Sequence, residues 1–204
     1  MSLKTTTRFL VILLLFISFL FGTFNLRAKS SQATIPINIT VSGKLIITDA
    51  ENDNRSGTDP TLNVVLKLTP ELNSSVISGR SAIRIRTNLN NWKLTAQRRD
   101  LSNPSITNID PKDVSVNFTT QAGSKANPNA GRLISPFDST TSLGQISTNA
   151  STDLLIGNTQ TSIDKDPENK NNWFQLTSDY SISPDFFYGI GEWDTIISYS
   201  LVSP

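Results

Sequence analysis

The hydrophobic pattern of the chain has a period of two around residues 81–98. In the first arm isoleucines alternate with arginines at 83–86, and in the second arm Trp92 and Leu94 alternate with polar residues such as Lys93. Successive side chains of a strand point to opposite faces, so each arm offers one apolar face and one polar face. The asparagine-rich link at 88–91 consists of residues that tolerate the positive φ of a tight reversal. The pattern predicts a β-hairpin with Trp92 buried and the basic side chains in solvent.

Strand patterns recur along the rest of the chain, separated by segments rich in turn-forming residues. We expect strands at 34–41, 45–47, 61–69, 113–119, 152–157, 172–178 and 194–202, with a short one near 132–134. We expect long loops near 49–60, 100–112, 120–150 and 164–171, the segment 120–150 being a mobile or binding excursion. After the N-terminus no segment has helical spacing of apolar residues over three turns. The sequence predicts an all-β fold, a single Ig-like or Greek-key β-sandwich covering residues 34–204.

The N-terminus has the layout of an export signal. Lys4 and Arg8 precede an apolar run at 9–21, which is shorter than the roughly 20 residues that a membrane span needs. Cleavage after Ala33, or alternatively after Ala28, would remove a signal peptide, residues 1–33 in the first case. An uncleaved single-pass anchor is the alternative. We therefore expect a secreted or cell-surface protein whose mature chain has no transmembrane segment.

The composition restricts the chemistry, because the chain has no histidine and no cysteine. Histidine-based triads, cysteine nucleophiles, zinc sites of these residues and disulfides are excluded. Asp49, Glu51 and Asp53 alternate like the first ligands of a calcium loop, but Asn54 and Pro60 stand where an EF-hand needs Gly and Glu. We expect no metal or cofactor, with calcium at these three carboxylates as the alternative. No pair of carboxylates is marked out for hydrolysis, so we expect no enzyme.

Charge is distributed unevenly along a chain whose net charge is only +1. Basic residues gather between 80 and 99, and the hairpin would place Arg84, Arg86 and Lys93 on one solvent face. Such a face would bind an anionic envelope polymer, or would simply keep an edge strand soluble. Nucleic acid is not expected as a partner, because the chain is exported and aromatic residues do not interleave with the basic cluster beyond Trp92.

Two short motifs resemble those of the WxL family of bacterial cell-surface domains. Trp92-Lys93-Leu94, within RTNLNNWKLTAQ, matches the first Trp-x-Leu motif. Near the C-terminus Tyr199-Ser200-Leu201 stands at the second motif, with Tyr199 in the Trp position. The resemblance implies a β-rich, non-catalytic module that attaches non-covalently to the cell wall, with Trp92, Leu94, Tyr199 and Leu201 as motif residues. On physical grounds we expect these four side chains to be core packing rather than a binding surface.

The segment 34–41 suggests a second function. It alternates strongly and follows the predicted cleavage site, which is the layout of a donor strand that completes the sheet of a neighbour. A fimbrial or coat-type subunit that forms homo-oligomers by strand addition is therefore the alternative to a module that binds a cell-wall polymer or other surface proteins.

Overall fold

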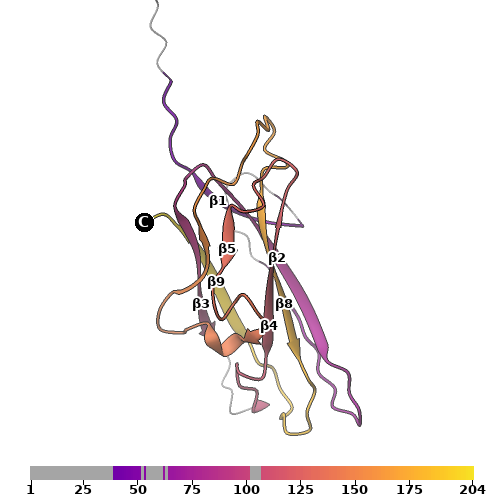
Figure 1. Ribbon diagram of the computed structural model, residues 1–204. Coiled ribbons are helices and arrows are strands. Elements are labelled where there is room, and N and C mark those ends of the chain that lie inside the picture. The colour runs from indigo at the N-terminus through magenta and orange to yellow at the C-terminus, as the bar shows by residue number, and fades with distance from the viewer. Residues whose placement is uncertain (1–38, 52, 54–61, 63, 102–106) are drawn as a thin grey trace, which may run out of the picture. The chain divides into compact units, whose positions relative to one another are not determined.

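The computed structural model describes residues 39–51, 53, 62, 64–101 and 107–204. The chain divides into two compact units, Met1–Thr40 and Val41–Pro204, and the described strands belong to the second unit. They are β1 (Leu45–Asp49), β2 (Ile77–Thr87), β3 (Trp92–Asp100), β4 (Ser115–Ala122), β5 (Gly131–Leu133), β6 (Thr141–Ser142), β7 (Thr152–Gly157), β8 (Phe174–Ile182) and β9 (Thr195–Val202), with the 3-10 helix η1 (Leu143–Gln145). One antiparallel sheet has the order β1-β2-β8-β4-β6 and the other the order β5-β7-β3-β9, and they pack together as shown in Figure 1. This confirms the predicted all-β sandwich.

From β3 onward every strand lies in the sheet opposite to that of the preceding strand. β2 pairs with β1 and β8, whereas β3 pairs with β7 and β9, so the predicted hairpin between them is wrong. Residues 88–91 form an arch from one sheet to the other, and none of them has a positive φ. The alternation itself is as expected. The apolar side chains of β2 and β3 meet across the interior between the two sheets. Two sheets that face each other bury more apolar surface than two neighbouring strands of one sheet.

Trp92 is central to the core between the sheets. Its indole is 2% exposed and packs edge-on against Phe174 of β8, with ring centroids 6.2 Å apart. The indole Nε1 donates a hydrogen bond to the Thr159 carbonyl oxygen at 2.8 Å. Gly157 of β7 leaves room for the ring, because a Cβ added there would lie 1.9 Å from Trp92 Cε2. Trp92 thereby links the four-stranded sheet to β8 in the five-stranded sheet.

Residues 120–150, predicted as a mobile or binding loop, belong to the sandwich instead. They contain the end of β4, all of β5, β6 and η1, and the expected short strand near 132–134 is β5. Their buried hydrophobic side chains are Ala126, Ala130, Phe137, Leu143 and Ile146. Phe137 packs edge-on against Phe118 of β4, with ring centroids 5.7 Å apart. The sequence pattern missed these contacts because single apolar residues in a polar segment show no period.

The predicted strand at 61–69 is not hydrogen-bonded as a strand where it is described, at residues 62 and 64–69. The apolar residues of its alternating pattern nevertheless pack against the core. Leu62, Val64, Leu66 and Leu68 are partly buried against the core. Val64 and Leu66 lie over Gly79 of β2, where an added Cβ would come within 2.8 Å of both side chains. The segment therefore covers β2 beyond the part that pairs with β1.

The predicted signal peptide and most of the predicted strand at 34–41 lie outside the described residues. Ile39, Thr40 and Val41, which are described, form no strand. The side chains of Ile39 and Val41 are 80% and 78% exposed. Within the described part of the chain, no helix has the length and apolar character needed to cross a membrane.

Candidate functional site

The three basic residues predicted to share a solvent face are separated in the structure. Arg84 and Arg86 lie on β2 of the five-stranded sheet, whereas Lys93 lies on β3 of the other sheet. Lys93 Nζ is 3.0 Å from Asp153 Oδ2 of β7. The predicted shared face is wrong, because it depended on pairing between β2 and β3.

Arg84 and Arg86 converge on the carboxylate of Asp53. Arg86 Nη2 lies 2.6 Å and Arg84 Nη1 3.2 Å from Asp53 Oδ2, and the Thr48 hydroxyl donates to Asp53 Oδ1 at 2.7 Å. Burial by itself raises the pKa of Asp53, but the hydrogen bonds from Arg86 and Thr48 and the charge of Arg86 outweigh it and hold the pKa at about 2. The guanidinium carbon of Arg84 lies 4.2 Å from the centre of the Trp173 ring, a cation–π contact.

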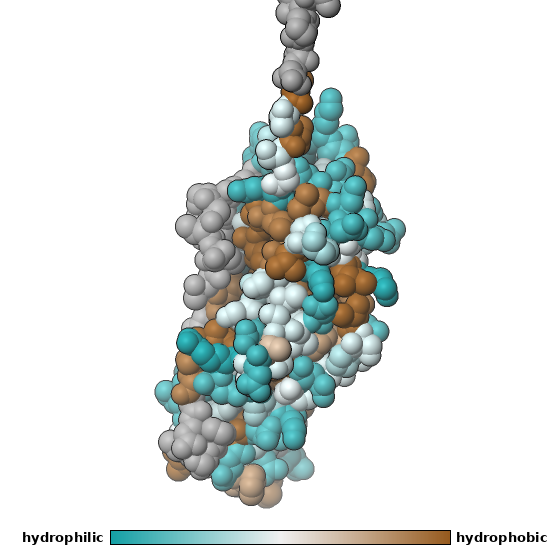
Figure 2. All heavy atoms as spheres, turned by 90° about the vertical axis from the view of Figure 1, so that its left-hand side faces the viewer, coloured by the Kyte–Doolittle hydropathy of each residue, from teal (hydrophilic) through white to brown (hydrophobic). Residues whose placement is uncertain are grey.

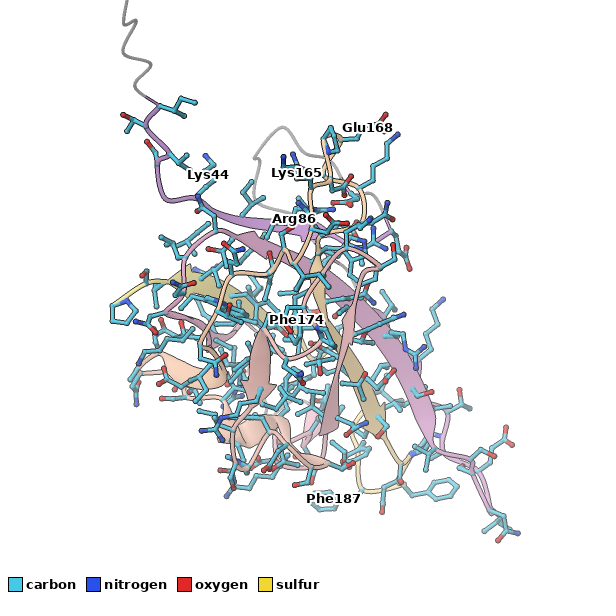
Figure 3. All side chains as sticks on the ribbon, turned by 45° about the horizontal axis from the view of Figure 1, so that its top comes forward. Lys44, Arg86, Lys165, Glu168, Phe174 and Phe187 are labelled. Carbon is cyan, nitrogen blue, oxygen red and sulfur yellow. The ribbon has the colours of Figure 1, made fainter. Side chains whose placement is uncertain are left out.

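Arg86 also anchors the segment before β8. Its Nε donates to the Asn169 carbonyl oxygen at 3.0 Å and to Asn172 Oδ1 at 3.1 Å. The Arg86 side chain is 8% exposed. In Figure 3 Arg86 lies at the same end of the molecule as Lys165 and Glu168. Arg86 therefore fixes loops on the outer face of the sheet, and its guanidinium group is already paired with Asp53 inside the protein.

The carboxylates proposed as calcium ligands are engaged differently. Asp53 is held by the two arginines, and Asp49 Oδ1 accepts a hydrogen bond from the Glu51 backbone N–H at 2.9 Å. Among the described residues there is no group of three or more acidic side chains arranged to hold a metal ion. Calcium at this loop stays an untested alternative, with Asp53 unavailable as a ligand unless both arginines move.

The four motif residues of the WxL resemblance lie on the neighbouring strands β3 and β9. Trp92 and Leu94 are buried, at 2% and 0% exposure, and Leu94 is opposite Leu201 in the ladder. Tyr199 and Leu201 are partly buried against the same core. These positions make all four side chains part of the sandwich interior.

The tyrosine at the second motif connects the two sheets. Its hydroxyl lies 3.2 Å from the Ser178 hydroxyl and 3.4 Å from the Tyr180 hydroxyl, both on β8. Burial raises the pKa of Tyr199 well above its ordinary value, so this hydroxyl stays protonated and the cluster is neutral.

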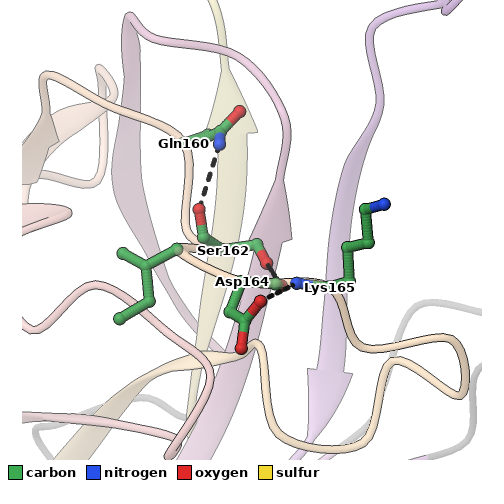
Figure 4. A pocket seen from close by; sticks show the side chains of 5 residues that line it. Gln160, Ser162, Asp164 and Lys165 are labelled. Carbon is green, nitrogen blue, oxygen red and sulfur yellow. Dashed lines mark hydrogen bonds between the residues drawn. The ribbon is translucent and has the colours of Figure 1, made fainter.

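Two surface features were not predicted from the sequence. The loop between β8 and β9 exposes Phe186, Phe187 and Ile190, the first two at 72% and 71%. Phe187 lies at the end opposite to Arg86 in Figure 3. A shallow depression is lined by residues 160 and 162–165. Figure 4 shows that its polar groups bond to one another, Gln160 donating to the Ser162 carbonyl oxygen at 3.0 Å, so it presents no convergent set of free donors or acceptors.

The C-terminal strand β9 provides the clearest candidate for a binding site. It pairs with β3 on one side and, within the described part of the chain, with no strand on the other. Leu101 N–H donates to the Asp194 carbonyl oxygen, and Arg98 N–H donates away from β9 to Ser147. Because hydrogen-bonded and non-hydrogen-bonded pairs alternate in an antiparallel ladder, these two bonds determine which β9 residues bond to β3. They are residues 196, 198, 200 and 202.

The backbone N–H and C=O groups of the alternate residues then point away from β3. These residues are Thr195, Ile197, Tyr199 and Leu201, and we call their outward-pointing backbone groups the free edge of β9. Their side chains are partly buried, while those of the residues between them are exposed. Ile196 and Val202 are exposed hydrophobic residues of this strand. Figure 2 looks onto the side of the molecule that lies on the left in Figure 1, and hydrophobic side chains gather there in patches.

Comparison with known proteins found no match, either among protein-family models or among curated proteins. The geometry of the chain itself is therefore the basis for a functional proposal.

Proposed function

We propose that this chain is an exported, non-catalytic β-sandwich subunit of the cell surface that joins to other chains by β-strand addition. The free edge of β9 is the acceptor. From the sequence we expect an exported protein without catalytic activity, and strand addition is one of the two functions that the sequence suggests.

The observation that supports it is the incomplete edge of the four-stranded sheet. Unpaired edges of this kind are templates for pairing with another chain, and soluble proteins usually shield them with charged residues, proline or a covering loop. None of the eight residues of β9 is charged or proline. Its inward side chains Ile197, Tyr199 and Leu201 remain only partly buried, so a further strand would both satisfy backbone groups and bury apolar surface.

Binding to an anionic envelope polymer stays a prediction. Arg84 and Arg86 share Asp53 and Lys93 contacts Asp153, so the residues first considered for this role are engaged within the protein. The wall-binding function implied by the WxL resemblance would need a different surface.

Proline at position 197 tests the edge directly. The Ile197 N–H points to the free edge, so Ile197→Pro removes an outward donor without removing a bond to β3. We expect the native protein, recovered from the surface of its host, to form assemblies much larger than one chain by light scattering. Ile197→Pro should be a single chain, whereas the control Ile197→Val should assemble like the native protein.

Circular dichroism and cooperative thermal unfolding would verify that Ile197→Pro is folded. A native protein that remains a single chain at every concentration would refute the proposal. So would a folded Ile197→Pro variant that still assembles.

A further inference from the structure

We propose that the strand added to β9 is the N-terminal segment 35–41 of a second copy of this chain, running antiparallel to β9. The inference rests on the proposed function and identifies the partner. Three independent features of the sequence and the structure agree on this segment, this direction and the need for a second copy.

The first feature is the side-chain pattern. Residues directly opposite in a ladder place their side chains on the same face of the sheet. The apolar side chains of the segment are at its odd positions, Ile35, Ile37, Ile39 and Val41. The inward-facing side chains of β9 are also at odd positions, and the even ones face solvent. Pairing odd with odd therefore buries the isoleucines of the segment over Ile197, Tyr199 and Leu201.

The second feature is Pro36, which has no backbone N–H. In an antiparallel pair, the odd residues of the segment would bond to the odd residues on the free edge of β9, and Pro36 would point away from the ladder. In a parallel pair, bonding residues are opposite non-bonding ones. Keeping the isoleucines inward would then turn Pro36 toward β9, where its missing N–H loses a bond. Pro36 therefore favours the antiparallel direction.

One register uses every available group. With Val41 opposite Thr195 and Ile35 opposite Leu201, all four odd residues of the segment face the four residues of the free edge. Asn38 then lies opposite Ser198, an exposed residue, at a non-hydrogen-bonded pair where Cα atoms are about 4.5 Å apart.

The third feature excludes pairing within one chain. The Ser42 carbonyl oxygen accepts a hydrogen bond from Asn88 Nδ2 at 2.9 Å, which holds Ser42 at the arch before β3. That arch is beside the C-terminal end of β9, since Ser203 Oγ donates to the Asn91 carbonyl oxygen at 2.8 Å.

The proposed register requires Val41 at the other end of β9. At about 3.3 Å per residue, the strand from Thr195 to Val202 is about 23 Å long. Val41 is only one Cα–Cα step of about 3.8 Å from Ser42. A chain cannot place its own segment in this register, so the segment must come from another copy.

Engineered cysteines provide the test, because the natural chain has none to interfere. Asn38→Cys and Ser198→Cys introduced together should form disulfides between chains, since about 4.5 Å between Cα atoms is within disulfide range. On a non-reducing gel the exported double variant should give a ladder of dimers, trimers and longer chains that reduction collapses. The control pair Thr40→Cys with Ser198→Cys is one diagonal step away, roughly 7–8 Å, and should cross-link several-fold less.

Each result has a defined meaning. A ladder, together with simple dimers when the two single-cysteine variants are mixed, supports the inference. A disulfide within one chain overturns it, because the segment would then fold back on its own sheet. Assemblies that persist and depend on the free edge, yet give no link between 38 and 198, also overturn it while the proposed function stands. If the protein never assembles, both fail.

Discussion

Replacing Asp53 by asparagine should destabilise the sandwich and change its response to acid. Asp53 is the shared anionic partner of Arg84 and Arg86, at a site where its own side chain is 16% exposed and that of Arg86 is 8% exposed. The variant Asp53→Asn keeps the size of the side chain but removes the negative charge. It leaves Arg86 facing Asn172, Asn169 and Thr48, none of which carries a charge.

The magnitude follows from the pKa of Asp53. In the folded protein this pKa falls from its ordinary value of 3.8 to about 2, and each pKa unit corresponds to about 1.4 kcal/mol. The ionised carboxylate therefore contributes about 2.5 kcal/mol to the free energy of unfolding. Because the folded pKa is the lower one, this contribution is complete above pH of about 4 and disappears as the pH falls toward about 2. Removing one partner of a buried ion pair costs about 3–5 kcal/mol, so we expect Asp53→Asn to lose about 2–4 kcal/mol.

Urea unfolding, followed by tryptophan fluorescence at several pH values between 2 and 7, would measure this loss. The native protein should lose stability between pH 4 and pH 2, and Asp53→Asn should lose less over the same interval. Asp153→Asn is the matched control, because its ion pair with Lys93 has both side chains 38% exposed and should contribute less than about 1 kcal/mol. An Asp53→Asn variant within 0.5 kcal/mol of the native protein at pH 7, roughly the scatter of surface substitutions, would refute the reasoning.

Two further substitutions test the packing between the two sheets. Gly157→Ala places a methyl group 1.9 Å from Trp92 Cε2 and should lower the free energy of unfolding by about 2 kcal/mol or more, whereas Gly144→Ala, with its closest contact at 3.2 Å, should change it little. Tyr199→Phe removes the hydroxyl near Ser178 and Tyr180 and should cost about 1 kcal/mol without altering assembly, since the free edge consists of backbone groups. Chemical denaturation measures both, and a neutral Gly157→Ala would contradict the described packing of Trp92.

Most strands could be located from the sequence, because side-chain alternation is a local property. Residues 152–157 were predicted within the bounds of β7, and β4, β8 and β9 overlap their predicted ranges. The strand partners could not be located. Proximity along the chain favours pairing of β2 with β3, whereas each strand after β2 follows one in the opposite sheet. In a sandwich connected in this way, the ladders join residues far apart in sequence.

In the candidate site, too, the sequence indicates local features but not the contacts between distant residues. Arg86 is 33 residues from Asp53 and 86 residues from Asn172 in the sequence. The local sequence around Arg86 therefore gives no sign of either partner. The sequence therefore indicates a solvent face for the basic residues, whereas tertiary contacts pair Arg84 and Arg86 with Asp53 and Lys93 with Asp153. The prediction that 120–150 is a long unstructured loop is wrong for a related reason, since Phe137 and Leu143 enter the core as single residues without a period.

The match between the segment 35–41 and the free edge of β9 depends on the phase of alternation in each strand. Along any strand, the direction of the side chain and the direction of the backbone N–H and C=O alternate together. In the segment 35–41 the sequence alone therefore determines that the isoleucine side chains and the missing N–H of Pro36 are in opposite phase, whichever sheet the segment joins. The structure supplies the phase of the acceptor strand, because it shows that the odd residues of β9 direct their backbone groups outward. Had Pro36 been at an odd position, burial of the isoleucines and antiparallel bonding would conflict. An Asn38→Pro variant keeps the permitted phase and Ile37→Pro breaks it, so assembly should tolerate the first far better than the second.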